Sequence, residues 1–272
     1  MLYLVATPIG NLGDLSPRAV EVLSSVDIIY CEDTRHTGLL LNHFEIKKPT
    51  RSLHTHNERE RTEEVVAALK DGRDIAYVSD AGMPGISDPG AMLIAACRKE
   101  GLPHTVIPGP SAAIIAAVLS GLPSQPFSFF GFLPREAKPR RDMLDAIAPI
   151  RHQVILYESP HRVQATLADL LDRFGDGPAA VLRELTKKFE TVVTGSLSEL
   201  IEHFSEEPKG ECVIAFLPGQ KNAEAAPDLD AVLLALLETE SVKDAAAIAA
   251  ERLSLPKKQV YRRALELKER NS

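Results

Sequence analysis

The sequence contains few aromatic residues and few cysteines. Of its 272 residues 5% are aromatic and none is tryptophan, and the three cysteines, Cys31, Cys97 and Cys212, lie far apart without a CxxC pair. Disulfide frameworks and thiolate metal sites usually show closely spaced or paired cysteines. The scarcity argues against both and favours a reducing compartment.

Long hydrophobic runs are also missing. No stretch approaches the roughly 20 apolar residues that span a bilayer. The apolar run Leu2–Val5 at the N-terminus lacks the basic region and small-residue cleavage site of a signal peptide. We therefore expect a cytoplasmic protein with no membrane partner.

Several common functional motifs do not occur. The phosphate-binding pattern GxxxxGK[ST], the dinucleotide pattern GxGxxG and the nucleophile pattern GxSxG are all absent. The sequence therefore lacks the motifs that would indicate a P-loop NTPase, a nicotinamide or flavin enzyme, or a serine hydrolase. His54 and His56 have no Glu, Asp or Cys at the spacing of a familiar zinc motif, so we expect no metal site.

The overall amino-acid composition is typical of a globular protein, with 44% hydrophobic and 25% charged residues. A formal net charge of −7 argues against a surface devoted to nucleic acid, although local basic clusters can still bind phosphates. Two such clusters occur, one formed by Arg135, Lys138, Arg140 and Arg141 and the other by Lys257, Lys258, Arg262, Arg263, Lys268 and Arg270. Each is either a phosphate-binding patch or a solvated charged face.

Short apolar β-type runs alternate with segments of helical periodicity, which predicts an α/β fold with substantially parallel sheets. The expected strands are Leu2–Val5, Ile28–Cys31, Ile75–Val78, Thr105–Ile107, Val154–Tyr157, Ala180–Leu182 and Cys212–Leu217. Helix starts are expected at Ser16-Pro17, Asp88-Pro89, Ser159-Pro160 and a capping box Ser196-x-x-Glu199, with helix ends at Gly72 and Gly121.

Two segments interrupt these patterns and suggest domain boundaries. The Pro- and Phe-containing stretch Leu122–Pro139 connects two expected α/β domains, residues 1–121 and 122–219, and Gly219–Pro227 is a second linker. The tail, residues 228–272, predicts helices over Asp228–Glu238, Val242–Leu253 and Lys257–Lys268, with a turn at Ser254–Pro256. This pattern indicates a helix-turn-helix that docks on phosphates, or a helical cap or dimerisation element.

Three turns rich in Gly and Pro follow expected strands: Thr7–Asn11, Ser79–Gly85 and Pro108–Ala112. In α/β sheets ligands bind at the carboxyl ends of strands, where such turns let backbone groups approach closely. The turns predict one shared ligand pocket, or they are ordinary loop turns in which Gly and Pro only set the backbone conformation.

Six segments, in order, closely resemble the ribosomal RNA small-subunit methyltransferase I family of the tetrapyrrole methylase superfamily. They are LVATPIGNLGD (4–14), EDTRHT (32–37), VSDAGMP (78–84), PGPSA (108–112), YESPHR (157–162) and RELTK (183–187). The tail is similar to the C-terminal helix-turn-helix of that family.

The resemblance implies a two-domain tetrapyrrole-methylase-like fold with a cofactor cleft between the domains, a small helical C-terminal region, and a homodimer. It also implies S-adenosylmethionine as cofactor and 2′-O-methylation of a cytidine ribose in the decoding region of 16S rRNA in the small ribosomal subunit. The implied cofactor-binding residues are Pro8, Ile9, Asp80, Gly82, Met83, Ser111, Ala112, Tyr157 and Glu158. Met83 stands where the family often has Thr, and Ser111 where Cys can occur.

A ribose hydroxyl is a poor nucleophile while it keeps its proton, so a nearby carboxylate is useful as a base. Asp33, Glu158 and Glu184 lie in the resembling motifs near expected strand ends. We favour Asp33 as base, Glu184 as a second catalytic candidate, and Arg35 as holding an RNA phosphate; a structural ion pair is the alternative for each. Lys187 and Lys188 are RNA contacts or exposed charge.

Two other functions remain compatible with these residues. One keeps the fold but methylates a corrin or porphyrin, against which the Glu32–Thr37 motif and the basic tail argue. The other is a non-catalytic RNA-binding or assembly factor, which the intact set of turns disfavours.

Overall fold

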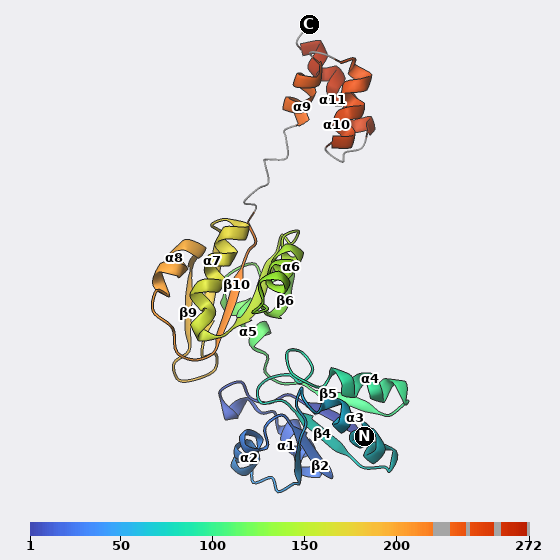
Figure 1. The fold of residues 1–272 in the computed structure, drawn as a ribbon, viewed down its shortest axis with the longest axis vertical. Helices are drawn as coiled ribbons and strands as arrows, with labels where there is room; N and C mark the ends of the chain where they lie inside the picture. Colours follow the sequence, from blue (N-terminus) through green and yellow to red (C-terminus); the bar gives the residue numbers. More distant parts are fainter. Residues whose placement is uncertain (220–228, 238–239, 253–256, 271–272) are drawn as a thin grey trace. The chain divides into compact units, whose positions relative to one another are not determined.

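A computed structural model describes residues 1–219, 229–237, 240–252 and 257–270 of the chain. The chain divides into two compact units, residues 1–219 and 220–272 (Figure 1). The strands are β1 Leu2–Val5, β2 Ile28–Cys31, β3 Thr50–Ser52, β4 Ile75–Val78, β5 His104–Ile107, β6 Phe127–Phe132, β7 Gln153–Glu158, β8 Pro178–Arg183, β9 Thr191–Ser196 and β10 Cys212–Phe216. The helices of the first unit are α1 Pro17–Ser25, α2 Thr34–His43, α3 Glu58–Lys70, α4 Ala91–Lys99, α5 Ala112–Leu119, α6 Ala137–Ile147, α7 Val163–Phe174 and α8 Leu197–His203, with short 3₁₀ turns η1 Leu12–Asp14 and η2 Pro160–Arg162.

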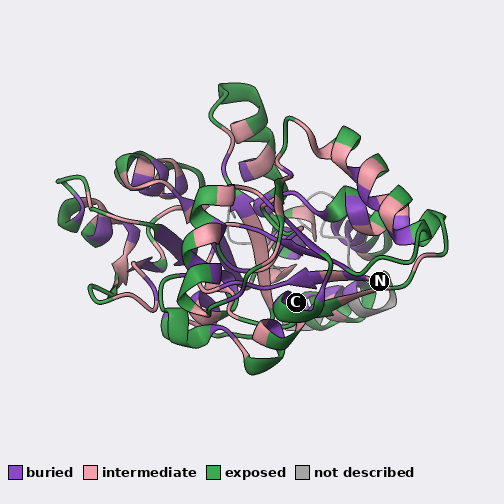
Figure 2. Cartoon of the chain, turned by 90° about the horizontal axis from the view of Figure 1, so that it is seen from below, coloured by how far each residue is buried: buried purple, intermediate pink, exposed green. Residues whose placement is uncertain are grey.

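The first half of this unit is a parallel sheet with the strand order β3-β2-β4-β1-β5. Helices α1 and α2 pack on one face, where Leu23 and Leu41 meet Val5 and Ile29. Helices α3 and α4 cover the other face, where Leu93 packs near Tyr77. Because both faces are covered, β2 and β4 are buried along their whole length, as expected for parallel strands. Figure 2 shows buried residues in purple and exposed residues in green, the latter mainly on helices and loops.

The second half corrects the prediction of substantially parallel sheets. Its strand order is β6-β7-β10-β8-β9; only β6 and β7 are parallel, and the other neighbours are antiparallel. A parallel connection needs a crossover of a dozen or more residues, and the short segment from Arg183 to Thr191 leaves room only for an antiparallel return.

The seven expected strands are present, and the sequence analysis missed β3, β6 and β9. Strand β6 lies inside the stretch Leu122–Pro139 that was interpreted as a connection. Gly131 has φ 66° and shifts the register there, so the simple alternation of side chains is lost. Strand β3 has only three residues, and β9 at the sheet edge is largely exposed.

Most of the expected helix ends are correct. Ser16 caps α1, Ser196 and Glu199 form the capping box of α8, and Gly72 and Gly121 follow α3 and α5 with positive φ. The start at Asp88 is wrong, because α4 begins at Ala91 after Gly90. At Ser159 the chain forms the 3₁₀ turn η2 before α7 begins.

Helix α5 joins the halves of the first unit. Ala113, Ala116 and Ala117 on α5, with Ile9 from the β1 loop, pack on the inner face of the second sheet. The outer face of that sheet carries α6, α7 and α8. The boundary expected at residue 121 stays a prediction, since residues 1–219 form one compact unit.

The second unit contains α9 Leu229–Leu237, α10 Val242–Arg252 and α11 Lys257–Arg270. A small core that includes Leu233, Ala249 and Val260 holds the three helices together. The expected turn at Ser254–Pro256 and the linker at 220–227 lie outside the described residues.

Candidate active site

A cavity of about 350 Å³ opens in the first unit, and both halves contribute to its wall. Its size is within the range of sites for small molecules and cofactors. Lining residues from the first half are Ile9, Ala81, Gly82, Met83, Ile86, Ser87, Asp88, Ser111 and Ala112. Those from the second half are Phe132, Tyr157, Glu158, Ser159, Pro160, Glu211, Cys212 and Val213.

The three predicted turns meet at this cavity. Thr7 and Gly82 exchange two backbone hydrogen bonds of 2.9 and 3.1 Å, which join the β1 and β4 loops. Gly82 has φ 78°, and a Cβ there would lie 3.3 Å from Cγ2 of Ile9. Gly109 is even tighter, because its Cβ would lie 2.8 Å from Cβ of Ala6. Glycine is therefore required where the backbones converge.

Tyr157 links the second sheet to α5 across the cavity wall. The backbone N–H of Ala113 donates a hydrogen bond of 3.2 Å to the Tyr157 hydroxyl. Phe129 and Phe132 contact the Tyr157 ring edge-on, and burial raises the pKa of its hydroxyl. The hydroxyl therefore stays neutral and serves as a fixed hydrogen-bonding group.

The structure brings nearly all the predicted cofactor residues to this wall. Ile9, Gly82, Met83, Ser111, Ala112, Tyr157 and Glu158 line the cavity, whereas Pro8 and Asp80 do not. Asp80 instead accepts a hydrogen bond of 3.1 Å from the backbone N–H of Asp33 and so fixes the end of β2. Cofactor binding by these residues stays a prediction.

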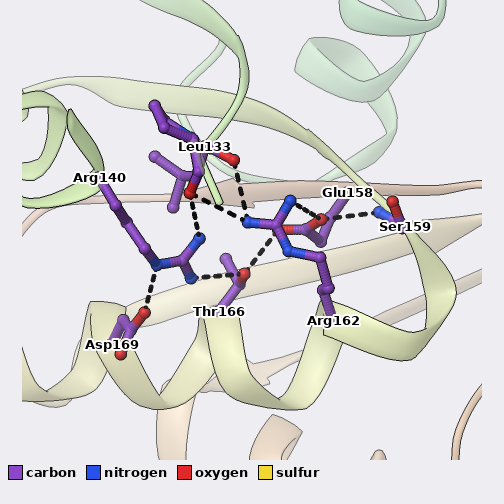
Figure 3. Close-up of polar contacts among 8 residues, drawn as sticks. Leu133, Arg140, Glu158, Ser159, Arg162, Thr166 and Asp169 are labelled. Atoms are coloured by element: carbon purple, nitrogen blue, oxygen red, sulfur yellow. Dashed lines mark hydrogen bonds and ion pairs between the residues drawn. The ribbon is translucent and has the colours of Figure 1, made fainter. Parts of the chain in front are cut away.

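The Glu158 side chain belongs to a buried polar network behind the wall (Figure 3). Its carboxylate is fully buried and accepts hydrogen bonds from the Ser159 backbone at 2.8 Å and the Thr166 hydroxyl at 2.6 Å. Arg162 lies 3.5 Å away and also donates to the Leu133 carbonyl at 2.9 Å. The network ties the end of β7 to α7 and to the segment that follows β6. Phe132, the last residue of β6, lines the cavity.

Arg140 extends the same network, so it belongs neither to an open phosphate-binding patch nor to a solvated charged face, the two alternatives for its cluster. Its guanidinium donates to Asp169 at 2.6 Å and to Thr166 at 2.9 Å, and its side chain is only 14% exposed. Arg135, Lys138 and Arg141 of that cluster are exposed.

The residues favoured for catalysis do not line the cavity. Asp33 caps α2, accepting a hydrogen bond of 2.8 Å from the Arg35 backbone, and its carboxylate pairs with the exposed Arg35 guanidinium at 2.8 Å. Hydrogen bonding to Arg35 lowers the pKa of the Asp33 carboxyl to about 2. So weak a base is poorly suited to take a proton at neutral pH.

Glu184 shapes the loop between β8 and β9. Its carboxylate binds Lys187 at 2.9 Å and the Glu211 backbone at 3.1 Å, and its φ is 53°. The hydrogen bond from Lys187 lowers the pKa of the Glu184 carboxyl. Lys187 also pairs with Glu211 at 2.9 Å, while Lys188 is exposed beside the Phe189 ring.

Two other carboxylates have raised pKa values, and one of them reaches the cavity. Asp88 lines it, and burial together with Asp80 raises the pKa of the Asp88 carboxyl. Burial, Asp88 and Asp80 likewise raise the pKa of Glu32, whose Oε2 is buried without a hydrogen-bond partner. Glu32 belongs to the same sequence motif as Asp33, whereas the sequence pattern favoured Asp88 as a helix cap.

The described part of the chain shows neither a metal site nor a membrane span. No three His, Cys, Asp or Glu side chains in it are arranged to hold a metal ion, and none of its helices is long and apolar enough to cross a bilayer. The rings of His54 and His56 lie edge to face, with centroids 5.9 Å apart.

Comparison with known proteins places this architecture in a family. The profile of the Tetrapyrrole (Corrin/Porphyrin) Methylases matches residues 1–201, so the chain belongs to that family and is a methyltransferase. Diphthine synthase shares the fold with a TM-score of 0.62 at 16% identity, over 80% of this chain and 90% of that one. Uroporphyrin-III-C-methyltransferase from Thermus thermophilus gives 0.58 at 22% identity, over 80% and 94%.

Within this family the chain is a member of the ribosomal RNA small subunit methyltransferase I group. The protein of that name from Vibrio cholerae is 48% identical over 98% of this chain and 94% of its own length. The one from Synechocystis is 46% identical over 98% of both chains. A profile described as the RsmI C-terminal HTH domain matches residues 223–268.

Proposed function

We propose that the protein transfers a methyl group from S-adenosylmethionine to the ribose 2′-hydroxyl of a cytidine in the decoding region of 16S rRNA. The observation that carries this proposal is the cavity where the three glycine-bearing turns meet Tyr157. The names of the relatives support ribosomal RNA of the small subunit as the substrate.

The residues of the cavity fit the cofactor. Gly82 leaves the backbone open to close approach, and Ile9 and Met83 offer apolar surface to an adenosyl group. When bound, the cofactor supplies an activated methyl group, so the protein's main task is to align the hydroxyl with it and to exclude water.

The rim of the same cavity offers a surface for the target nucleotide. Ile86 and Phe132 line it, yet 62% and 50% of their surfaces are exposed. An enzyme that modifies RNA at a ribose needs the target nucleotide out of its stack, where apolar and aromatic side chains contact the base. These two side chains therefore offer an apolar rim for the incoming cytidine.

The helical tail is proposed to bind RNA. In it Lys257 and Arg262 are exposed, whereas Arg263 pairs with Asp230 at 2.6 Å and with Glu266 at 2.7 Å and is held within the unit. We expect deletion of residues 228–272 to weaken binding of RNA about tenfold or more, in line with the loss of several phosphate contacts. Cofactor affinity, measured by calorimetry, should be unchanged; equal loss of both affinities would contradict the assignment.

A homodimer is the proposed assembly, and α5 offers a surface for it. Ile114 and Val118 lie one turn apart on α5 and are 52% and 67% exposed. Such apolar exposure on one helix face marks an interaction surface. We expect Val118→Asp to convert a dimer into a monomer in analytical ultracentrifugation, whereas Val192→Asp on the exposed edge strand β9 should leave the dimer intact.

Tritiated methyl transfer to small ribosomal subunits tests the activity itself. The expected product after digestion of the RNA is 2′-O-methylcytidine. Labelling of a base, or labelling of a porphyrin and not of RNA, would refute the proposed substrate.

A further inference from the structure

We propose that Asp88 is the general base of the reaction and accepts the proton of the ribose 2′-hydroxyl. This inference rests on the proposed function and names a catalytic residue for it. It replaces Asp33, which the sequence pattern favoured.

Asp88 is the one of these two aspartates that faces the cavity. It lies in the loop between β4 and α4, is half-buried, and lines the cavity together with Ser87 and Tyr157. Asp33 lies at the cap of α2, outside the lining residues. A base has to reach the proton it takes, so position favours Asp88 over Asp33.

The loop that carries Asp88 is held firmly. The Gly90 N–H donates a hydrogen bond of 2.9 Å to the Glu58 carboxylate, and Gly85 donates one of 3.0 Å to the Pro89 carbonyl. Gly90 has φ 129° and packs so closely on Tyr77 that a Cβ would lie 3.0 Å from that ring. The carboxylate is thus presented from a rigid backbone, as positioning for catalysis requires.

The charges around Asp88 favour uptake of a proton. Asp80 at the end of β4 and Glu32 at the end of β2 act on it as negative neighbours, while Ser79 acts in the opposite direction and lowers the pKa of Asp88. Tyr157 from β7 lines the same cavity, and Tyr77 from β4 and Glu58 from α3 belong to the same electrostatic neighbourhood. No ion pair among the described residues involves Asp88 or Glu32.

The consequence is a carboxylate that binds a proton more readily than an ordinary aspartate. Because Glu32 and Asp88 act on each other, they titrate as a pair rather than as independent groups. Oε2 of Glu32 is buried without a hydrogen-bond partner, so no hydrogen bond offsets the effect of this oxygen on Asp88.

The proposed step moves one proton and one methyl group. The 2′-hydroxyl proton passes to a carboxylate oxygen of Asp88 as the ribose oxygen forms its new bond to the methyl carbon. The bond between that carbon and sulfur breaks, and its electron pair stays on sulfur as a neutral thioether. Asp88 is only half-buried, so it can return the proton to water before the next turnover.

Asp88→Asn keeps the size and hydrogen-bonding capacity of the side chain but cannot take the proton. We expect the single-turnover rate at neutral pH to fall about 100-fold or more, the range typical of loss of a general base. The wild-type rate should rise with pH through the apparent pKa of the pair and then level off, because the base must be ionised; the variant should lose this rise. Asp71→Asn, at an exposed aspartate after α3, is the matched control and should keep the wild-type rate.

Calorimetry and thermal unfolding provide readouts besides activity. Asp88→Asn should change the affinities for S-adenosylmethionine and S-adenosylhomocysteine by the same small factor, below about threefold. Its melting temperature should rise: the folded-state pKa of Asp88 lies above the unfolded value, so ionisation costs stability at neutral pH and the amide removes this cost.

Three results would overturn the inference. An Asp88→Asn rate within about threefold of wild type excludes a base at this position. A selective loss of affinity for the sulfonium over its neutral product would show that Asp88 only balances the charge of the cofactor. Loss of the pH-dependent rise in Asp33→Asn would return the role to that residue. A wild-type enzyme that does not methylate small subunits at all would refute the proposed function instead.

Discussion

Replacement of Glu158 by leucine is expected to lower the free energy of unfolding by about 3–5 kcal/mol, the usual loss when one member of a buried ion pair is removed. The Glu158 carboxylate is fully buried, and leucine would leave Arg162 without its ion-pair partner and the Thr166 hydroxyl without its acceptor. Urea unfolding followed by circular dichroism measures this loss. Because the network holds the segment after β6, the same variant should also loosen the Phe132 side of the cavity.

A surface ion pair between two helices serves as the control for the Glu158 substitution. Asp145 on α6 pairs with Arg173 on α7 at 3.0 Å, with side chains 55% and 43% exposed. Asp145→Ala should cost less than about 1 kcal/mol, as exposed pairs do. If Glu158→Gln keeps wild-type stability but no longer binds S-adenosylmethionine, then Glu158 acts on the cofactor and not on the fold.

Gly82→Val is expected to weaken the affinity for S-adenosylmethionine at least about tenfold. The substitution adds bulk at the cavity wall and strains the backbone. Gly82 has φ 78°, which a β-branched residue rarely adopts, and its Cβ would press on Ile9. Any shift of this backbone also disturbs the hydrogen bonds that join Gly82 to Thr7. Calorimetric titration with the cofactor gives the measurement.

Gly72→Val separates the two causes. Gly72 follows α3 with φ 82°, almost the same backbone angle, but a Cβ there would meet nothing within 4 Å. Both variants should therefore lose similar stability, and only Gly82→Val should lose the cofactor. Equal loss of affinity in both would show that backbone strain, and not the cavity wall, is responsible.

The location of the cavity was predictable from the sequence because it depends on the backbone. Turns with glycine and proline after buried strands must lie at one edge of a parallel sheet, and those containing Ile9, Gly82 and Ser111 do line the cavity. Local signals also sufficed for helix caps such as Ser16 and Ser196, whose hydrogen bonds involve residues three positions away.

The roles of the charged residues were harder to predict because neighbours in sequence face opposite environments. The pKa of Glu32 is raised by burial, Asp88 and Asp80, while the adjacent Asp33 caps α2 and pairs with the exposed Arg35. Arg140 resembles a member of an exposed basic cluster, yet it closes a network with Thr166 and Asp169. Partners far along the chain decided each of these outcomes.

The α/β class, the helical tail and the turns that form the cavity could be predicted from the sequence, because they follow from side-chain periodicity and from the backbone demands of glycine and proline. The family followed from the resemblance of six motifs to a known family. The tertiary structure alone decided the antiparallel pairing in the second sheet, the burial of Glu158 and the placement of Asp88 on the cavity wall. The physical reason is that burial and charge coupling depend on contacts between distant segments, which no local pattern encodes.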